Sequence, residues 1–278
     1  MLAKSTRSML ASVGLALLVA APGALEDARA QSNNSVKFST IVKRAKGGNV
    51  EAQLALGKAY EEGKNVKRDF LTAANWYKRA LRQGDVEATF RLARLVHRGG
   101  GKLAQSPDLA AQLYRRAAQQ GHSGAQNWLG FCYQFGFGLT RDYARAVNWY
   151  RKAAEQGDPA AQNNLAMLYL TGKGVSRDLL KAAQLFRAAV KKRYAWAENN
   201  LGGLYEMGWG VRRNPKRAKD LYRSAAASGN EQAKKNLKRL ADAQAAADAK
   251  IAAEATAKAA AKAEAEPEPK RVKITIED

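Results

Sequence analysis

Residues 125–154 read AQNWLGFCYQFGFGLTRDYARAVNWYRKAA, and residues 161–190 read AQNNLAMLYLTGKGVSRDLLKAAQLFRAAV. The second stretch repeats the order of the first at an interval of 36 residues. In both stretches, the first half contains a small residue beside a leucine and ends in a Gly-x-Gly loop. An aspartate follows the loop, and the second half contains two adjacent large side chains. Self-similarity at such a period is typical of repeat architectures, and the pattern continues in both directions along the chain.

The first half of the pattern occurs six times, at intervals of 36 or 37 residues. The copies are counted from Gly48, Gly84, Gly121, Gly157, Arg193 and Gly229. Alanine stands four positions after each of these residues and leucine eight positions after, and a small residue follows the leucine in the five full copies. These positions share one stripe of a helix. The small residue lets a second helix approach closely, and a glycine ends the helix cheaply in the left-handed conformation.

The second half of the pattern predicts another helix. Residues suited to N-capping precede it in all five full copies, namely Asp69, Ser106, Asp142, Asp178 and Asn214. A helix–turn–helix unit of this kind buries its apolar stripe only by stacking on its neighbours. The sequence therefore predicts an all-α solenoid of five helix–turn–helix repeats of about 36 residues, with a C-terminal capping helix.

The motif resembles that of the Sel-one-like repeat family, relatives of the tetratricopeptide solenoids. It is carried by Ala-Gln-x-x-Leu-Gly-x-x-Tyr, Gly-x-Gly-Val, an acidic cap and Ala-x-x-Trp-Tyr-x-x-Ala-Ala, and is nearest complete at 125–154 and 161–190. The second repeat departs most, with Val96 in place of tyrosine and an enlarged loop. The resemblance implies a right-handed solenoid and adaptor or scaffold work without a shared enzymatic activity. By analogy with exported members, a role as a periplasmic regulator is also expected.

The first thirty residues have the organisation of a cleaved secretory signal. Two basic residues precede an apolar run over 9–21, and Ala28-Arg29-Ala30 is a small-x-small cleavage site. We therefore expect a periplasmic or secreted chain, cleaved near Ala30/Gln31; a retained signal anchor is the alternative. No later segment is long and apolar enough to span a bilayer.

The rest of the chain divides by composition. The predicted organisation is a signal peptide over 1–30, a polar N-terminal segment over 31–45, the solenoid over 46–240, an alanine-rich tail over 241–269 and a strand-like segment over 270–278. The alanine-rich tail either extends the capping helix into solvent or is disordered, because it has little to bury. The alternating last residues either dock on the sheet edge of a partner or form an unstructured tail.

The sequence offers little for chemistry. Cys132 is the only cysteine and stands in an apolar helical pattern, where a buried side chain is favoured over a reactive thiol. The two histidines, His97 and His122, lie in different repeat positions, and no Cys/His cluster has metal-ligand spacing. Serine and histidine are too sparse for a catalytic triad. We predict no enzyme, no metal and no cofactor.

The first helices suggest a groove that binds a protein partner. Asn127, Asn163 and Asn199 recur at one position and would form a ladder of donors and acceptors for the backbone of an extended peptide. A structural role for these asparagines is the alternative. Further along these helices, Phe131, Met167, Trp196 and Met207 would add apolar pockets or pack between repeats. The leading hypothesis is an adaptor or regulator that binds an envelope protein or peptide.

The formal net charge is +22 for the chain and +23 for residues 31–240, because the tail beyond is slightly acidic. One position of the second helix is basic in every repeat, and a loop adds two further arginines; these candidate anion-binding residues are Lys78, Arg115, Arg151, Arg187, Arg223, Arg212 and Arg213. Such a stripe would attract anions. Export argues against nucleic acid, so acidic polysaccharide or anionic lipid head groups are the second hypothesis, and a solvated outer face is the alternative.

Overall fold

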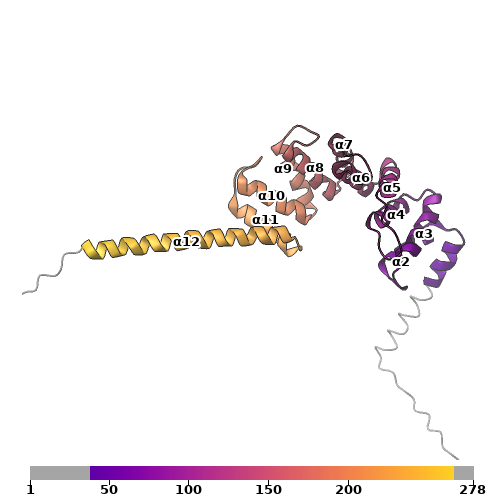
Figure 1. The fold of residues 1–278 in the computed structure, drawn as a ribbon, viewed down its shortest axis with the longest axis horizontal. Helices are drawn as coiled ribbons and strands as arrows, with labels where there is room; N and C mark the ends of the chain where they lie inside the picture. The colour runs from indigo at the N-terminus through magenta and orange to yellow at the C-terminus, as the bar shows by residue number, and fades with distance from the viewer. Residues whose placement is uncertain (1–37, 266–278) are drawn as a thin grey trace, which may run out of the picture. The chain divides into compact units, whose positions relative to one another are not determined.

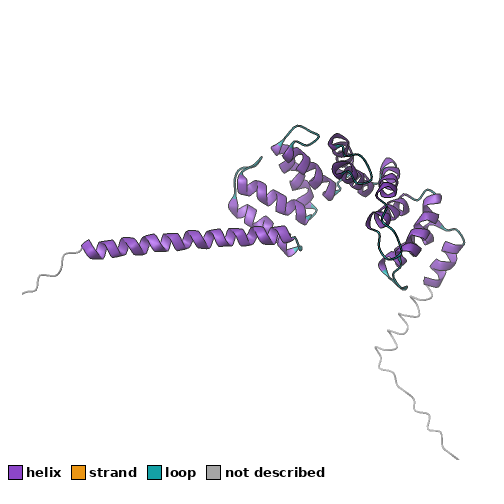
Figure 2. Cartoon of the chain, in the orientation of Figure 1, coloured by secondary structure: helices purple, strands orange, loops and turns teal. Residues whose placement is uncertain are grey.

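The computed structural model describes residues 38–265, and its regular structure there is helical (Figures 1 and 2). The predicted solenoid of five helix–turn–helix repeats with a C-terminal helix is confirmed. The predicted signal peptide over 1–30 and the predicted strand-like segment over 270–278 lie outside the described residues. Residues 38–46 are also helical and precede the first repeat.

Each repeat consists of two helices of equal length. The repeats are α2 (Val50–Glu62) and α3 (Phe70–Arg82), α4 (Val86–Arg98) and α5 (Pro107–Gln119), α6 (Ser123–Phe135) and α7 (Tyr143–Glu155), α8 (Pro159–Thr171) and α9 (Leu179–Lys191), and α10 (Ala195–Met207) and α11 (Pro215–Ala227). The C-terminal helix α12 (Glu231–Ala265) follows them. We refer to these pairs as repeats one to five.

The contacts divide the described residues into two compact units. Of the described residues, unit one contains 38–88 and 99–104, and unit two contains 89–98 and 105–265. In unit one, Ala45, Ala52 and Leu56 form a core, and apolar residues before and after it pack against this core. These packing residues are Phe38, Ile41, Val42, Tyr60 and Trp76. The segment before the first repeat thus covers the open end of its core.

Close packing between the two helices of a repeat explains the small residue beside the leucine. A Cβ atom at Gly202 would lie 2.7 Å from Cε1 of Tyr222, which is 2% exposed. A Cβ atom at Gly130 would come equally close to the ring of Tyr150, at 2.7 Å. The buried tyrosine also donates its hydroxyl proton to the first helix, as in the 2.7 Å bond from Tyr150 to Oε1 of Gln134. The glycine and the tyrosine therefore form one packing unit.

The N-caps of the second helices follow the prediction with one exception. The side chains of Asp69, Asp142, Asp178 and Asn214 each accept a hydrogen bond from a backbone N–H in the first turn. Ser106 occupies the N-cap of α5, but its side chain makes no capping bond. Pro107 does not explain this exception, because Asn214 caps α11 from the same position before Pro215.

The second glycine of the Gly-x-Gly loop has a role that the sequence did not reveal. A Cβ atom at Gly174 would collide with the backbone of Tyr143, at the start of the second helix of the preceding repeat. One at Gly210 would collide in the same way with the backbone carbonyl of Leu179. The loop therefore requires glycine because backbone packs on backbone between repeats.

Helix α12 belongs to the solenoid only over its first part. Ala233 is fully buried, whereas residues 241–261 are all exposed. In Figure 1 this second part of α12 extends away from the rest of unit two. Of the two alternatives for the tail up to Ala265, the structure has the extended helix. None of the described helices has the length and apolar character needed to cross a membrane.

Candidate partner-binding surfaces

Each of the three asparagines of the predicted ladder accepts a hydrogen bond from another asparagine, on the first helix of the next repeat or on α12. Asn164 donates to Oδ1 of Asn127 at 3.0 Å, and Asn200 donates to Oδ1 of Asn163 at 2.9 Å. Asn236 continues the series on α12 with a 2.9 Å bond to Oδ1 of Asn199. The network thus joins α6, α8, α10 and α12 through side-chain amides.

The side-chain amide nitrogens of two ladder residues, Asn163 and Asn199, also donate hydrogen bonds within the protein. Asn163 donates to Oδ1 of its neighbour Asn164, and Asn199 donates to Oδ1 of Asn200, both at 3.3 Å. Asn163 and Asn199 are 7% and 8% exposed. Buried amides with satisfied hydrogen bonds stabilise a unique packing. The geometry favours the structural alternative for these two asparagines and leaves little of them for a peptide backbone.

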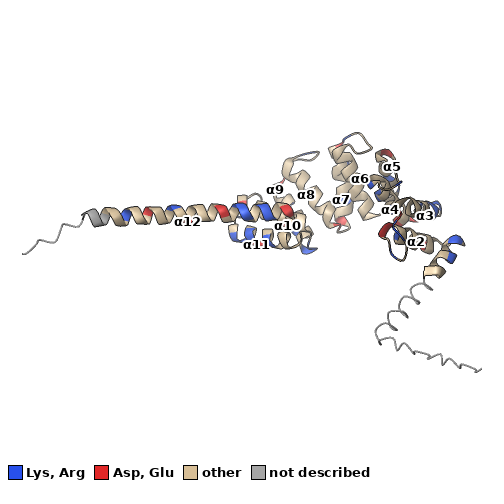
Figure 3. Ribbon diagram, turned by 60° about the horizontal axis from the view of Figure 1, so that its bottom comes forward, with Lys and Arg blue, Asp and Glu red and all other residues tan. Residues whose placement is uncertain are grey.

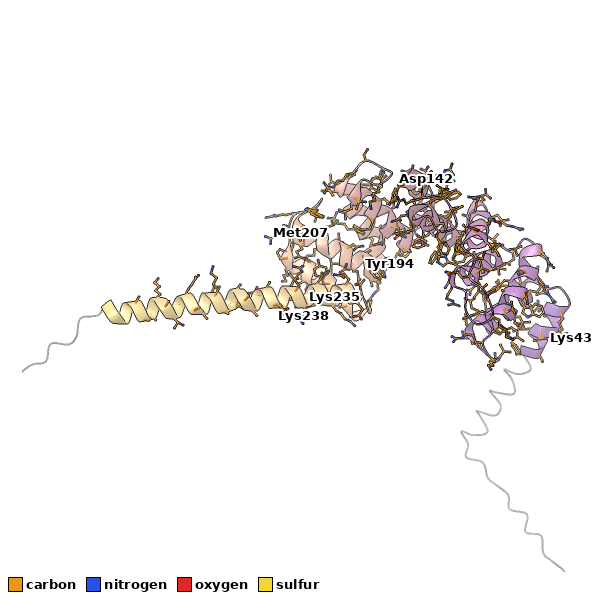
Figure 4. All side chains as sticks on the ribbon, in the orientation of Figure 1. Lys43, Asp142, Tyr194, Met207, Lys235 and Lys238 are labelled. Atoms are coloured by element: carbon orange, nitrogen blue, oxygen red, sulfur yellow. The ribbon has the colours of Figure 1, made fainter. Side chains whose placement is uncertain are left out.

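Exposed apolar side chains lie on the same helices. Trp196 is 56% exposed. Met207, which is labelled in Figure 4, lies at the end of α10 and is 57% exposed. Phe135 occupies on α6 the repeat position of Met207 and is 61% exposed. Its ring centroid lies 4.6 Å from that of Phe131, which is half-buried, as is Met167 on α8. We call Phe131, Phe135, Met167, Trp196 and Met207 the apolar surface.

Met207 was a candidate from the sequence, whereas Phe135 was missed although a signal was present. They precede the glycine that ends the first helix, a position that is polar in the other repeats, where it holds Glu62, Arg98 and Thr171. An apolar residue at a position that the fold leaves exposed is informative. Trp209 in the following loop is another exposed aromatic residue, at 46%.

The basic position of the second helix contacts the next repeat. Arg115 donates to the hydroxyl of Tyr133 and Arg187 to that of Tyr205, both at 3.3 Å. Arg151 lies at the hydroxyl of Tyr169 in the corresponding place and, with Lys181, lowers the pKa of that phenol. These three arginines therefore do not form a free outer stripe.

The other predicted anion-binding residues have separate surroundings. Arg223 forms an exposed ion pair with Asp220 at 2.9 Å, and Nε of Arg213 donates to the carbonyl of Glu206 at 3.1 Å. Lys78 and Arg212 are exposed. Figure 3 shows basic residues on α11 and on the first turns of α12. The structure thus distributes these seven residues over several local environments.

The nucleophilic and titratable side chains serve the core. Cys132 is completely buried, and burial raises the pKa of its thiol to about 12. His97 stacks on Phe137 with ring centroids 4.1 Å apart, and burial lowers the pKa of its imidazole. His122 caps α6 by accepting the N–H of Ala125 at 3.1 Å. Within residues 38–265, no three His, Cys, Asp or Glu side chains are placed to hold a metal.

The comparison with protein families agrees with the repeat geometry. The family model "Sel1 repeat" matches residues 50–85, 86–122, 123–158, 159–194 and 197–230. The chain belongs to the Sel1 repeat family. Proteins with Sel1 repeats generally act as scaffolds in protein–protein interaction and are typically non-catalytic.

Two solved structures are similar to this Sel1 repeat protein. One is c5321, a protective antigen of uropathogenic Escherichia coli with an SLR fold, at 34% identity and a TM-score of 0.65; the match covers 72% of this chain and 43% of that chain. The other is a Sel1 repeat protein from Oxalobacter formigenes, at 32% identity and a TM-score of 0.65, with 68% and 75% covered. The chain thus spans less than half of the first relative. A search of curated proteins finds no match.

Proposed function

We propose that this Sel1 repeat protein is a non-enzymatic adaptor or regulator that binds an envelope protein through the apolar surface of its first helices. The observation that carries the proposal is the exposure of Phe135, Trp196 and Met207, each more than half exposed. Methionine and aromatic residues are enriched in protein–protein interfaces, and clustered exposure of such side chains is typical of an interaction site.

The spacing of these residues supports one continuous face on each helix. Trp196 and Met207 are eleven residues apart, which is close to three helical turns, so they lie on the same side of α10. Phe131 and Phe135 are one turn apart on α6, and their rings are in contact. The half-buried Met167 occupies on α8 the repeat position of Phe131. The surface therefore follows the first helices from α6 to α10.

The asparagine network supports the proposal in another way. Its bonds between α6, α8, α10 and α12 hold neighbouring first helices in fixed register. A surface held in this way is preorganised, which lowers the entropic cost of binding an extended segment. The asparagines in this proposal position the apolar surface, and the apolar side chains contact the partner.

Site-specific photocrosslinking in living cells tests the proposal. We expect p-benzoylphenylalanine at position 135 or 207 to give adducts of one size, because both positions would contact the same partner. Leu180 on α9 is 66% exposed and serves as a matched control outside the surface. Adducts of equal yield at position 180, or none at 135 and 207, would contradict the proposal.

We further propose that the protein is exported and cleaved near Ala30/Gln31. The basic, apolar and small-x-small order of residues 1–30 supports this location. Mass spectrometry of the protein purified from a periplasmic fraction should find an N-terminus at residue 31. An intact N-terminus in the cytoplasmic fraction would reject export.

The hypothesis of an anionic polymer as partner has no specific observation in its favour. Arg115 and Arg187 are hydrogen-bonded to tyrosines of the next repeat, and Arg151 lies at Tyr169. The family suggests protein partners and lends no support to polysaccharide or lipid. We therefore propose a protein partner alone.

A further inference from the structure

Unit two places a tyrosine between two cations in three successive repeats. A cation from the preceding repeat lies at the hydroxyl, and one from the same repeat lies over the ring. The three sets are Arg115, Tyr133 and Arg145; Arg151, Tyr169 and Lys181; and Arg187, Tyr205 and Arg217. The distances from the second cation to the ring centroid are 5.6, 4.9 and 4.9 Å.

The middle set lines an open groove. A hollow of about 250 Å³ lies between α7 and α9, with α8 as its floor. Arg151 and Lys181 border it, and Leu165 and Leu185 supply apolar contacts. In repeat three the position of Leu185 is held by the larger Trp149. The groove at Tyr169 thus combines two positive charges with an apolar wall.

The two cations of this groove are not neutralised by a carboxylate. Among the described residues, neither Arg151 nor Lys181 forms an ion pair; Arg151 donates to the amide oxygen of Asn148 at 3.3 Å. In the set of repeat three, by contrast, Arg145 pairs with Asp142 at 3.2 Å. The groove at Tyr169 therefore keeps a positive field that an anionic ligand would stabilise.

The pKa of the Tyr169 phenol is lowered by the positive charges around it. Burial raises the pKa of its phenol, but hydrogen bonds from Arg151 and Lys181, together with their charges, lower it further than burial raises it. The net direction is a lowered pKa, although the side chain is only 4% exposed. The surroundings of the hydroxyl thus favour negative charge.

We propose that the groove formed by Arg151, Tyr169 and Lys181 binds a single carboxylate carried on a short apolar stem. The planar guanidinium of Arg151 suits a carboxylate, and Leu165 with Leu185 suits the stem. Drug-sized ligands occupy pockets of roughly 300–1,000 Å³, so a hollow of about 250 Å³ fits a fragment. Glu155 also lines the groove and reduces the formal charge of its lining to one positive, which suits a singly charged group better than a doubly charged one such as phosphate.

This site is separate from the apolar surface. Tyr169 follows Met167 by two residues, and about 100° of rotation per residue places the two side chains far apart around α8. Most residues that line the groove belong to the second helices α7 and α9, whereas the apolar surface lies on the first helices. The proposal therefore does not depend on the adaptor function, and either one can fail without the other.

Calorimetric titration of the purified protein with hexanoate tests the proposal. We expect saturable binding that weakens at least tenfold in Arg151→Gln and in Lys181→Met. Arg187→Gln removes the same charge and the same kind of arginine–tyrosine bond one repeat further on, so it should bind hexanoate within twofold of wild type. Circular dichroism of each variant verifies that the repeats remain folded.

The outcomes separate a built site from general electrostatics. Absence of saturable hexanoate binding, or an equal loss in Arg187→Gln, would overturn the proposal. Two sources of the carboxylate are compared with hexanoate and with N-acetyl-leucyl-glutamate amide as probes. Tighter binding of the peptide assigns an acidic side chain of a protein as ligand, and tighter binding of hexanoate assigns a small free carboxylate.

Discussion

Helix α10 and the part of α12 beyond Leu240 are helical for different reasons. More than half of α10 is buried, including Leu201, Leu204 and Tyr205. Residues 241–261 of α12 are all exposed and rich in alanine. Their side-chain contacts are local, such as the bond from Gln244 to Asp248 at 2.8 Å. Tertiary packing therefore holds α10, whereas intrinsic propensity holds the distal part of α12.

The difference lies in what each helix loses when a residue changes. A substitution in α10 changes contacts with α9, α11 and α12, and it therefore changes the free energy of unfolding of the repeats. A substitution in the distal part of α12 changes only local helix stability. Substitution experiments can therefore test whether the boundary between the two regimes falls near Leu240, as the burial indicates.

The largest contrast is expected in thiol reactivity. Cys132 is buried, and its raised pKa of about 12 means roughly a thousandfold less thiolate at pH 8 than a thiol of ordinary pKa near 9. A cysteine introduced by Ala247→Cys on the exposed part of α12 should react at the rate of a free thiol. Ellman's reagent should thus label one thiol in the variant and none in the folded wild type.

The same pKa fixes the direction of a pH effect on stability. The pKa in the folded state is raised above that of the unfolded chain, so the neutral Cys132 contributes stability that is fully present below about pH 9. That contribution is lost as the pH rises toward 12. Rapid labelling of Cys132 at pH 8 without unfolding would show that α6 opens locally and would remove the contrast with α12.

The asparagine network should show the next largest effect. Asn199→Ala removes the acceptor of Asn236 and the donor to Asn200 in a buried site. Because partners are left unsatisfied, we expect a loss of about 2–3 kcal/mol in the free energy of unfolding. Asn148→Ala, at an exposed position of α7, is the control and should change it by less than about 0.5 kcal/mol. Equal effects in urea unfolding would show that the network adds nothing.

Two adjacent glycines in α10 should respond with opposite signs. Gly202→Ala places Cβ 2.7 Å from the buried ring of Tyr222, and we expect a net loss of about 1–2 kcal/mol despite better helix propensity. At Gly203 the nearest atom is the Tyr222 hydroxyl oxygen at 3.7 Å, so Gly203→Ala should stabilise by about 0.5–1 kcal/mol. Urea unfolding of both variants measures the change in the free energy of unfolding for each. The same sign for both would contradict the close packing seen in the structure.

The repeat fold could be predicted because many positions recur at fixed spacing. The capping aspartates and the small residue beside the leucine each recur at one position of the repeat. The former indicate a helix N-terminus, and the latter indicates close packing of two helices. The helix beyond Leu240 was left open, because alanine-rich composition indicates propensity but no packing partner. The role of Gly174 could not be predicted, because it depends on the close approach of backbone segments from two different repeats.

The candidate sites were less predictable because equivalent positions look alike in sequence. Arg115, Arg151 and Arg187 occupy one column, yet the described groove at Arg151 depends on Leu185 of another helix. Asn163 and Asn199 also form a column, and their recurrence fits either a peptide ladder or a structural network. Only side-chain geometry separates these alternatives, since both need the same amide at the same spacing.

The smallest effect is expected from removing the distal part of α12. Truncation after Leu240 leaves Asn236 and the ion pair of Arg239 with Glu206 at 2.7 Å in place. Since residues 241–261 bury nothing, the midpoint of thermal unfolding should change by no more than about 1 °C. Truncation after Glu231 is the destabilising control, because it removes buried Ala233 and the bond from Asn236. A large drop in the unfolding temperature after the first truncation would mean that the distal part of α12 packs on the repeats. Tertiary packing would then hold both α10 and the distal part of α12.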